Sequence, residues 1–378
     1  MPQCEGNAPP SKAARAGSFP LGTGVAKPFS PRIMSLEKVV VVGASGYSGE
    51  ELVRILSRHP HAEIAAITSR QLAGQTLASV YPRFGGTRYA GLKFIDSTSE
   101  AILATGARIV FLALPHGVAS EYAAPLVKAG LRVLDLSADF RIKDLAVYEE
   151  FYGEKHHAPE LAAASVYGLP ELYRDKIKDA QVVACPGCYP TSVLVPLVPL
   201  LRRQLVKAGS ICVFSMSGVS GAGRNAKTDY LFAECNESVR AYGVPKHRHL
   251  AEIEQELSIA AGSAVKISFT PHLIPVNRGI HTTIYAAPED GIEPFHFANA
   301  WKEDYGASKF VRLLGEKELP DTKHVTGTNF VDIAFRHDAR TGRVVILSAE
   351  DNLVKGAAGQ AVQCLNILCG WPEETALL

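Results

Sequence analysis

The feature that most constrains the fold of this chain is a glycine-rich turn between an apolar run and an amphipathic stretch. Residues 39–42 are four valines, which is typical of a parallel strand covered on both faces. A G-x-x-G-x-x-G turn follows, and residues 50–56 place their apolar side chains on one helical face. Such a turn lets the backbone approach a pyrophosphate, and the helix start offers free N–H groups to its oxygens. The sequence therefore predicts an α/β fold with a Rossmann-type nucleotide-binding domain, whose loop residues are Gly43, Ala44, Ser45, Gly46, Tyr47, Ser48 and Gly49.

The second expected strand, residues 64–67, indicates which dinucleotide binds. It ends in Thr68-Ser69-Arg70, where an NAD site usually presents an acidic residue to the ribose 2′-hydroxyl. A hydroxyl and a guanidinium suit a 2′-phosphate instead, so Ser69 and Arg70 favour NADP. The alternative is that Arg70 is a solvated loop arginine.

Two later apolar runs, residues 109–114 and 131–136, predict further strands of the same parallel sheet. Ligands of such sheets bind outside the carboxyl ends of the strands, so we expect the residues after each run to face the cofactor crevice. These are Pro115 and His116, which we expect to contact the cofactor, and Ser137 and Arg141, which are candidate substrate binders. Arg141 suits a phosphate or carboxylate, or alternatively an interdomain ion pair.

The motif Cys185-Pro-Gly-Cys188 follows the last expected strand of this unit, residues 182–184. It could be a redox pair, half of a zinc site, or a single nucleophile with a neighbouring cysteine. Zinc would require a second ligand pair that the sequence lacks, so no metal is expected. Cys188 stands at the probable start of a helix, where the dipole and free N–H groups would stabilise its thiolate and form an oxyanion hole. The alternative is a buried, inert cysteine.

Five motifs together resemble the N-acetyl-γ-glutamyl-phosphate reductase family over residues 37–371. They are Gly43–Gly49, Leu136–Arg141, Pro186–Thr191, Ser217–Arg224 and His247-Arg-His249. The resemblance implies a nucleotide-binding domain of residues 37–187 with 352–371. A catalytic domain of residues 188–351, of the aspartate-semialdehyde dehydrogenase type, would follow, with a C-terminal helix returning to the first domain. Strand candidates at 211–214, 265–270, 280–286, 331–335 and 344–349 agree with a mixed or antiparallel sheet there. Asp351-Asn352 would cap a helix over 353–368.

The resemblance also implies a reaction, the NADPH-dependent reduction of N-acetyl-γ-glutamyl phosphate to the γ-semialdehyde through a thioester on Cys188. It selects His247 over His249 as the acid/base, which spacing alone could not do. Arg224 would share phosphate and carboxylate binding with Arg141, and the cofactor contacts would include Ser217, Gly218 and Asn352.

Other functions stay open at this point. Acyl phosphates such as N-acetyl-aminoadipyl or aspartyl phosphate differ from this substrate by a methylene or an acetyl group, and a methylene gives only about 1–3 kcal/mol of discrimination. A cysteine acyltransferase or hydrolase would use Cys188 and His247 without a hydride, but it leaves the glycine loop unexplained. A nucleotide-sensing regulator would bind NADPH without turnover.

Composition restricts the partners and the compartment. A net charge of +1 offers no basic field for nucleic acid, and no apolar stretch approaches the roughly 18 residues of a membrane span. Seven cysteines, an odd and sparse set, favour a reducing compartment such as the cytoplasm. Residues 1–36 are rich in proline and lack periodicity, which predicts a disordered extension. It would be a plastid or mitochondrial transit peptide, or the product of a start upstream of Met34. We also expect a homo-oligomer, dimer or tetramer, with a small-molecule substrate.

Overall fold

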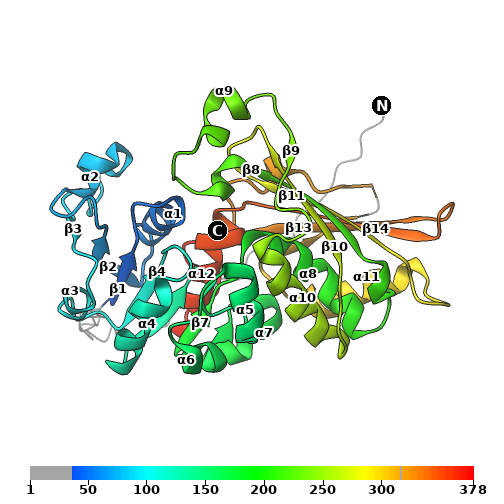
Figure 1. The fold of residues 1–378 in the computed structure, drawn as a ribbon, viewed down its shortest axis with the longest axis horizontal. Helices are drawn as coiled ribbons and strands as arrows, with labels where there is room; N and C mark the ends of the chain where they lie inside the picture. The colour runs from blue at the N-terminus through cyan, green and yellow to red at the C-terminus, as the bar shows by residue number, and fades with distance from the viewer. Residues whose placement is uncertain (1–35, 316) are drawn as a thin grey trace, which may run out of the picture. The chain divides into compact units, whose positions relative to one another are not determined.

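The computed structural model describes residues 36–315 and 317–378, and Leu36–Leu378 form one compact unit. The predicted N-terminal extension therefore lies, apart from Leu36, outside the described residues. Figure 1 shows the two sheets of this unit with their helices. Because both sheets belong to one unit, the domain boundaries at 187/188 and 351/352 stay predictions.

The first sheet is parallel throughout and has seven strands in the order β3-β2-β1-β4-β5-β7-β6. Valines 39–42 of its central strand are fully buried, as the uninterrupted apolar run predicted. The strands are β1 (Glu37–Val42), β2 (Ala62–Thr68), β3 (Phe94–Ile95), β4 (Ile109–Leu112), β5 (Arg132–Asp135), β6 (Val166–Tyr167) and β7 (Val182–Ala184).

Helices cover both faces of this sheet, which confirms the predicted Rossmann-type arrangement. On one face, α1 (Tyr47–Leu56) and the C-terminal helix α12 (Gly359–Leu368) share a core with β1 and β2. On the other face, α4 (Ala119–Lys128) packs with β1, β4 and β5. The smaller helices of this region are α2 (Leu77–Val80), α3 (Ser99–Leu103), α5 (Leu145–Tyr152), α6 (Pro159–Ala164), α7 (Pro170–Ile177) and η1 (Pro82–Phe84).

The second sheet is mixed, as predicted, and its seven strands run in the order β12-β13-β14-β11-β8-β10-β9. Its core lies against α8 (Cys188–Arg202), α10 (Arg248–Ala261) and α11 (Pro294–Tyr305). The strands are β8 (Cys212–Gly218), β9 (Arg240–Ala241), β10 (Ser268–Ile274), β11 (Ile280–Ala286), β12 (Val311–Leu313), β13 (Val331–Asp338) and β14 (Arg343–Glu350). Short helices complete the region: α9 (Phe232–Cys235), η2 (Ala208–Ser210), η3 (Val219–Ala222), η4 (Thr228–Tyr230) and η5 (Thr322–His324).

Several predicted strands end at other residues than expected, for example β4 at Leu112 and β8 at Gly218, and two predicted elements begin differently. The strand expected at 265–270 begins at Ser268, because Val265 and Ile267 are buried but precede the first paired residue of β10. The helix expected over 353–368 begins with a π-helical turn, η6 (Val354–Ala358), before α12. Its cap is Asp351 alone, whose carboxylate accepts from the N–H groups of Leu353 and Val354 at 2.7 and 3.1 Å.

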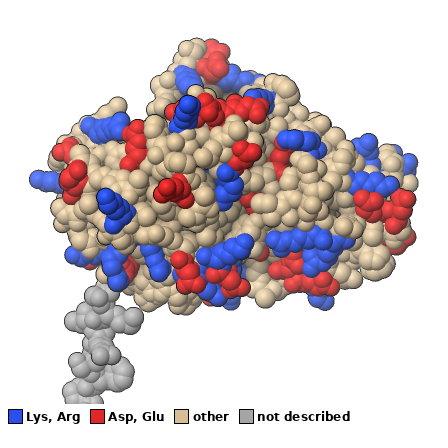
Figure 2. Space-filling model, turned by 60° about the horizontal axis from the view of Figure 1, so that its bottom comes forward, with Lys and Arg blue, Asp and Glu red and all other residues tan. Residues whose placement is uncertain are grey.

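Charged side chains of both signs are interspersed on the face shown in Figure 2. None of the helices in 36–315 and 317–378 combines the length and apolar character needed to cross a bilayer.

Candidate active site

The glycine turn after β1 is built for close backbone approach. Gly43 has a φ of +81°, and a Cβ there would lie 2.4 Å from the carbonyl oxygen of Ala113. A Cβ at Gly49 would lie 2.3 Å from the carbonyl oxygen of Gly43, so this glycine lets α1 pack against the loop. The N-cap of α1 is Gly46, which has no capping side chain. The first N–H groups of the helix are therefore free to bind an anion.

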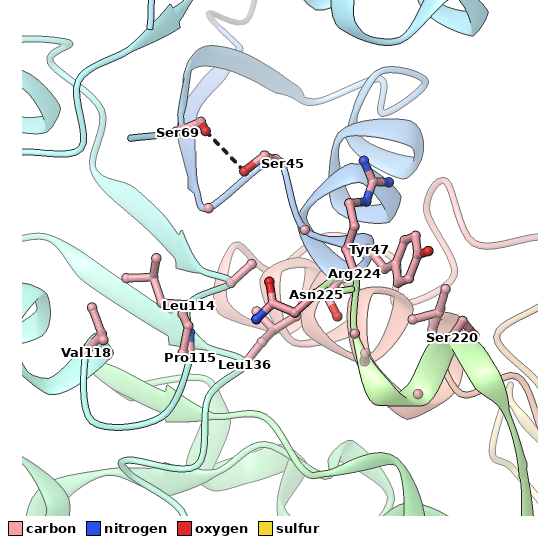
Figure 3. A pocket seen from close by; sticks show the side chains of 18 of the residues that line it. Ser45, Tyr47, Ser69, Leu114, Pro115, Val118, Leu136, Ser220, Arg224 and Asn225 are labelled. Carbon is pink, nitrogen blue, oxygen red and sulfur yellow. Dashed lines mark hydrogen bonds between the residues drawn. The ribbon is translucent and has the colours of Figure 1, made fainter. Parts of the chain in front are cut away.

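These N–H groups border a cavity of about 890 Å³, which we call the cofactor cavity. Figure 3 shows part of its lining, with residues from the loop, from the end of β4 and from the segment after β8. Most of the predicted cofactor residues line it, namely Gly43, Ser45, Gly46, Tyr47, Ser48, Ser69, Arg70, Pro115 and Asn352. Ala44 and Gly49 are buried beside the loop and do not line the cavity.

The cofactor cavity is also lined by the residues predicted to bind the 2′-phosphate of NADP. The hydroxyl of Ser69 donates to that of Ser45 at 3.1 Å, as the dashed line in Figure 3 marks. Arg70 is exposed, and its guanidinium donates to the Tyr122 hydroxyl at 3.5 Å. Within the described part of the chain, no Asp or Glu lines the cavity. This surface suits a phosphate better than a bare ribose hydroxyl pair.

Cys188 is the first residue of α8, as predicted, and it lines both the cofactor cavity and a second cavity of about 710 Å³. The prediction that the helix start makes its thiol acidic is wrong. Burial, together with the nearby Glu350, raises the pKa of Cys188 to about 12, and the N–H of Tyr189 offsets this only in part. At this half-buried position, the cost of removing the thiolate from water exceeds the attraction of the helix end.

Two neutral imidazoles lie beside this cysteine. His249 lines both cavities and packs on the turn before the helix, because a Cβ at Gly187 would lie 2.6 Å from its Nε2. His247 lines only the second cavity, and its Nδ1 caps α10 by accepting the N–H of His249 at 3.1 Å. Burial lowers the pKa of His247 to about 4 and that of His249 well below 6.5. Both rings are therefore uncharged near pH 7 and can accept a proton.

The buried carboxylate of Glu252 links Arg141 to the turn that precedes Cys188. Glu252 accepts from the Gly187 N–H at 3.0 Å, the Tyr167 hydroxyl at 2.6 Å and Arg141 at 3.3 Å. Arg141 also donates to the carbonyl oxygens of Leu136 and Cys185, both at 2.7 Å. Its ion-pair partner is thus Glu252, a residue that sequence reasoning missed, and two of its five N–H groups remain for a ligand.

The second cavity is rich in cations, and we call it the basic cavity. Predicted residues Ser137, Arg141, His116 and Ser217 line it. The lining includes four further basic side chains and one acid: Lys227, Arg240, Lys246, Arg248 and Asp229. Such a lining suits a small molecule with more than one negative group.

Several predicted residues lie elsewhere than expected. Arg224 does not line the basic cavity; it lines the cofactor cavity, stacks over the Tyr47 ring at 4.7 Å and pairs with Glu50. Ser217 and His116 line the basic cavity and not the cofactor cavity. Gly218 lines neither of them, because the backbone of Asn277 lies 2.8 Å from where its Cβ would be.

Asn352 joins three segments at the cofactor cavity. Its Oδ1 accepts from the Gly279 N–H at 2.8 Å, and its Nδ2 donates to Ser220 at 2.9 Å. The other cysteine of the motif, Cys185, is buried beside Cys364 of α12. In 36–315 and 317–378, no group of three or more His, Cys, Asp or Glu side chains has a metal-binding arrangement.

The neighbours of Cys188 that sequence reasoning did not select are His249, Glu252 and Glu350. Glu252 left a signal, because it falls on the apolar face of α10 one turn after His249. Glu350 left a weaker one, an acid at the end of the apolar strand β14. Neither pattern shows that the side chain lies near Cys188.

Two domain families match the chain in succession. "Semialdehyde dehydrogenase, NAD binding domain" matches residues 38–180, and "Semialdehyde dehydrogenase, dimerisation domain" matches residues 188–352. Solved structures share the fold at low identity. Aspartate semialdehyde dehydrogenase II of Vibrio cholerae has a TM-score of 0.67 at 18% identity, covering 89% of this chain and 98% of that one. The NADP complex of the Candida albicans enzyme has a TM-score of 0.64 at 17% identity, covering 88% and 99%.

Curated relatives are much closer in sequence. N-acetyl-gamma-glutamyl-phosphate reductase of Akkermansia muciniphila is 57% identical over 344 residues, which cover 91% of this chain and 99% of that protein. The proteins of the same name from Moorella thermoacetica and Geobacter sulfurreducens are 48% and 50% identical, each over 90% of this chain and 97% of their own length.

Proposed function

This chain belongs to the N-acetyl-γ-glutamyl-phosphate reductase family, and we propose that it reduces N-acetyl-γ-glutamyl phosphate to N-acetylglutamate γ-semialdehyde in arginine biosynthesis. The reaction consumes NADPH and releases phosphate. The observation that carries the proposal is the position of Cys188 on the wall shared by the cofactor cavity and the basic cavity. A nucleophile there reaches a substrate on one side and a nicotinamide on the other.

The residues fit a dinucleotide. The free N–H groups of α1 would hold the pyrophosphate, and Ser69 and Arg70 would hold the 2′-phosphate of NADP. The bound cofactor would supply the hydride. Asn352 and Pro115 line the cavity between the loop and Cys188, where they would orient the nicotinamide.

The thiol of Cys188 would attack the γ-acyl carbon, and the bond to the phosphate oxygen would break with its electron pair on that oxygen. His249 would take the thiol proton and pass it to the departing phosphate. With the hydride that the bound cofactor would supply, the acyl group held on Cys188 would be reduced, and the aldehyde would leave with the C–S electron pair returning to Cys188 as a thiolate. The thiolate then recovers a proton from solvent through the same imidazole.

We assign the acid/base to His249, whereas the family resemblance selected His247. The packing of His249 on Gly187 and its position in both cavities support this assignment. Substitution His249→Asn is expected to lower kcat by about 10²- to 10⁴-fold. His247→Asn is the matched control, because asparagine still caps a helix, and it should cost less than about tenfold. Equal losses in the two variants would return the role to His247.

The basic cavity would bind the two anionic ends of the substrate, with Arg141 on one of them. Acyl phosphates one methylene longer or shorter are the nearest alternatives.

The decisive assay follows NADPH formation from NADP, phosphate and N-acetylglutamate semialdehyde. The proposal requires strict dependence on phosphate and a higher kcat/KM than for N-acetyl-aminoadipate or aspartate semialdehyde. Turnover without phosphate would instead support simple aldehyde oxidation, and binding of NADPH without turnover would support a sensor.

We also propose a homo-oligomer formed through the second sheet. Phe214, Met216 and Tyr285 share one face of this sheet and are 44, 38 and 36% exposed, which is unusual for three large apolar side chains on neighbouring strands. The matched "dimerisation domain" covers these residues. Light scattering should give a dimer or tetramer that Phe214→Glu dissociates; a monomeric wild type would contradict the proposal.

We propose the cytoplasm as the compartment, consistent with free thiols at Cys185, Cys188, Cys212, Cys235, Cys364 and Cys369.

A further inference from the structure

Glu350 is an acid that the proposed chemistry does not use, and its environment is unusual. It is the last residue of β14 and has no exposed surface. Neither Oε1 nor Oε2 has a hydrogen-bond partner within the described residues. An ionised carboxylate without partners is very costly inside a protein, and burial accordingly raises the pKa of Glu350 well above its usual value. Burial therefore opposes ionisation of this side chain.

This acid lies directly behind the nucleophile. Gly356, in the π-helical turn η6, brings the two together, because a Cβ at this position would lie 2.7 Å from the Cβ of Cys188 and 3.1 Å from Oε1 of Glu350. The Cys188 Cβ and the Glu350 Oε1 are thus at most 5.8 Å apart, the sum of these two distances. Glu350 lines neither the cofactor cavity nor the basic cavity, so it approaches the cysteine from the protein side.

The cation whose charge acts on Glu350 is already paired. Lys355, which has no exposed surface, donates to Glu171 of α7 at 2.7 Å and to Gln363 of α12 at 2.8 Å. Asp351 adds a further negative group at the end of the same strand, and it is bound to Arg278 at 3.5 Å. A negative charge on Glu350 would therefore lie near one cation, Lys355, and near two other carboxylates, those of Glu171 and Asp351.

Other elements present titratable groups to Cys188, and their charges are already accounted for. These groups are Arg141 before α5, Glu252 and His249 on α10, Tyr189 on α8 and Tyr242 after β9. Arg141 and Glu252 neutralise each other, and the histidine is uncharged. Glu350 is the acid near the cysteine that has neither a counter-ion nor a hydrogen bond.

We infer that Glu350 is a positioning residue for the nucleophile, which keeps Cys188 in the protonated thiol form until a substrate binds on the cavity side. A carboxylate at Glu350 and a thiolate at Cys188 repel each other at this separation, so an ionised Glu350 opposes loss of the Cys188 proton. The resting cysteine is thereby protected from electrophiles and oxidants, which attack the thiolate. The inference rests on the proposed function only in taking Cys188 as the nucleophile.

The test is the pH dependence of Cys188 alkylation by iodoacetamide, without substrate or cofactor, followed by mass spectrometry of the peptide that contains Cys188. In the wild type the rate should rise about tenfold per pH unit from pH 7 to 9 with no plateau, since the thiol pKa is about 12. Glu350→Gln, which has the same shape and no charge, should be alkylated about tenfold faster at pH 9, as expected for a thiol pKa about one unit lower. Glu350→Leu should shift the profile in the same direction.

A matched control is Glu256→Gln, because Glu256 is also buried and accepts from Tyr173 one helical turn beyond Glu252. Its alkylation profile should coincide with that of the wild type. Superimposed profiles for Glu350→Gln and the wild type would overturn the inference, even if the melting temperature changed. The result is independent of turnover: a shifted profile in a chain without reductase activity would support this inference and contradict the proposed function, and an unshifted profile in an active enzyme would do the reverse.

Discussion

Two strand–glycine–helix junctions in this protein share one local design and differ in what packs on them. β1 leads through the loop 43–46 into α1, and β7 leads through Cys185–Gly187 into α8. Each helix has a glycine N-cap, Gly46 or Gly187, without a capping side chain. Both junctions border the cofactor cavity, but at the second one the N–H of Gly187 already donates to Glu252 and the ring of His249 packs on the turn. We therefore expect the first junction, whose N–H groups are free, to bind an anion and the second to hold a nucleophile.

The packing around the second junction also reverses the expected direction of the pKa shift of Cys188. A helix start favours negative charge by typically about 0.3–1 kcal/mol at an exposed position. At Cys188, burial and the nearby Glu350 outweigh the N–H of Tyr189, and the pKa of the thiol rises to about 12. A helix end therefore makes a cysteine reactive only when its surroundings allow the charge.

The largest expected effect comes from a substitution at the second junction that removes turnover and leaves cofactor binding at the first junction unchanged. Cys188→Ser retains the shape of the second junction but replaces the thiol by a much weaker nucleophile. Phosphate-dependent NADPH formation should fall at least about 10⁴-fold, while the dissociation constant for NADPH, measured by fluorescence titration, should change less than about twofold. Substantial residual turnover would show that the reaction does not require the thioester.

The second prediction removes the charge that holds the second junction. In Glu252→Gln, the amide oxygen can still accept from Gly187 and Tyr167, but the NH₂ group then faces the donors of Arg141. Leaving a buried arginine without its counter-ion typically costs about 3–5 kcal/mol, so the free energy of unfolding in urea should fall by this order. Glu256→Gln, one helical turn later, leaves Arg141 untouched and should cost clearly less. Equal losses would mean that the Arg141 contact adds nothing.

The third prediction deforms the first junction. Gly43→Ala introduces a Cβ 2.4 Å from the Ala113 carbonyl oxygen at a φ of +81°. The strained backbone alone costs about 1–2 kcal/mol, and the loop must move to relieve the contact. NADPH affinity should fall at least about tenfold, whereas alkylation of Cys188 should be unchanged. Gly209→Ala in η2 is the control, because a Cβ there would have no neighbour within 4 Å and Gly209 does not line the cofactor cavity. Unimpaired binding in Gly43→Ala would show that this loop does not hold the cofactor.

The contrast between the junctions also explains what the sequence could predict. The valine run, the glycine loop and α1 lie within about twenty residues of one another, so local pattern was sufficient for the strand, the turn and the lining of the cofactor cavity. The start of α8 at Cys188 was predicted for the same reason. The acidity of Cys188 was not, because Glu252 and Glu350 reach it from distant parts of the chain. Arg224 was misplaced likewise, since its contacts with Glu50 and Tyr47 join segments about 175 residues apart.

The smallest expected effect concerns which dinucleotide the first junction prefers. Arg70 is exposed, so its bond with a 2′-phosphate is partly screened by water, and Arg70→Ala should weaken NADPH binding by about tenfold. NADH carries no 2′-phosphate and its affinity should be unchanged, so the preference for NADPH falls by the same factor. Ser69→Ala is the comparison variant: the Ser69 hydroxyl also bonds Ser45 of the glycine loop, and its loss should weaken both dinucleotides. Titrations with each dinucleotide at two salt concentrations decide the matter, because a contact through charge diminishes as ionic strength rises. If Arg70→Ala weakened NADPH and NADH equally, Arg70 would act on the shape of the loop and not on the phosphate, and the preference for NADP would have to come from the absence of a carboxylate at this end of the cavity.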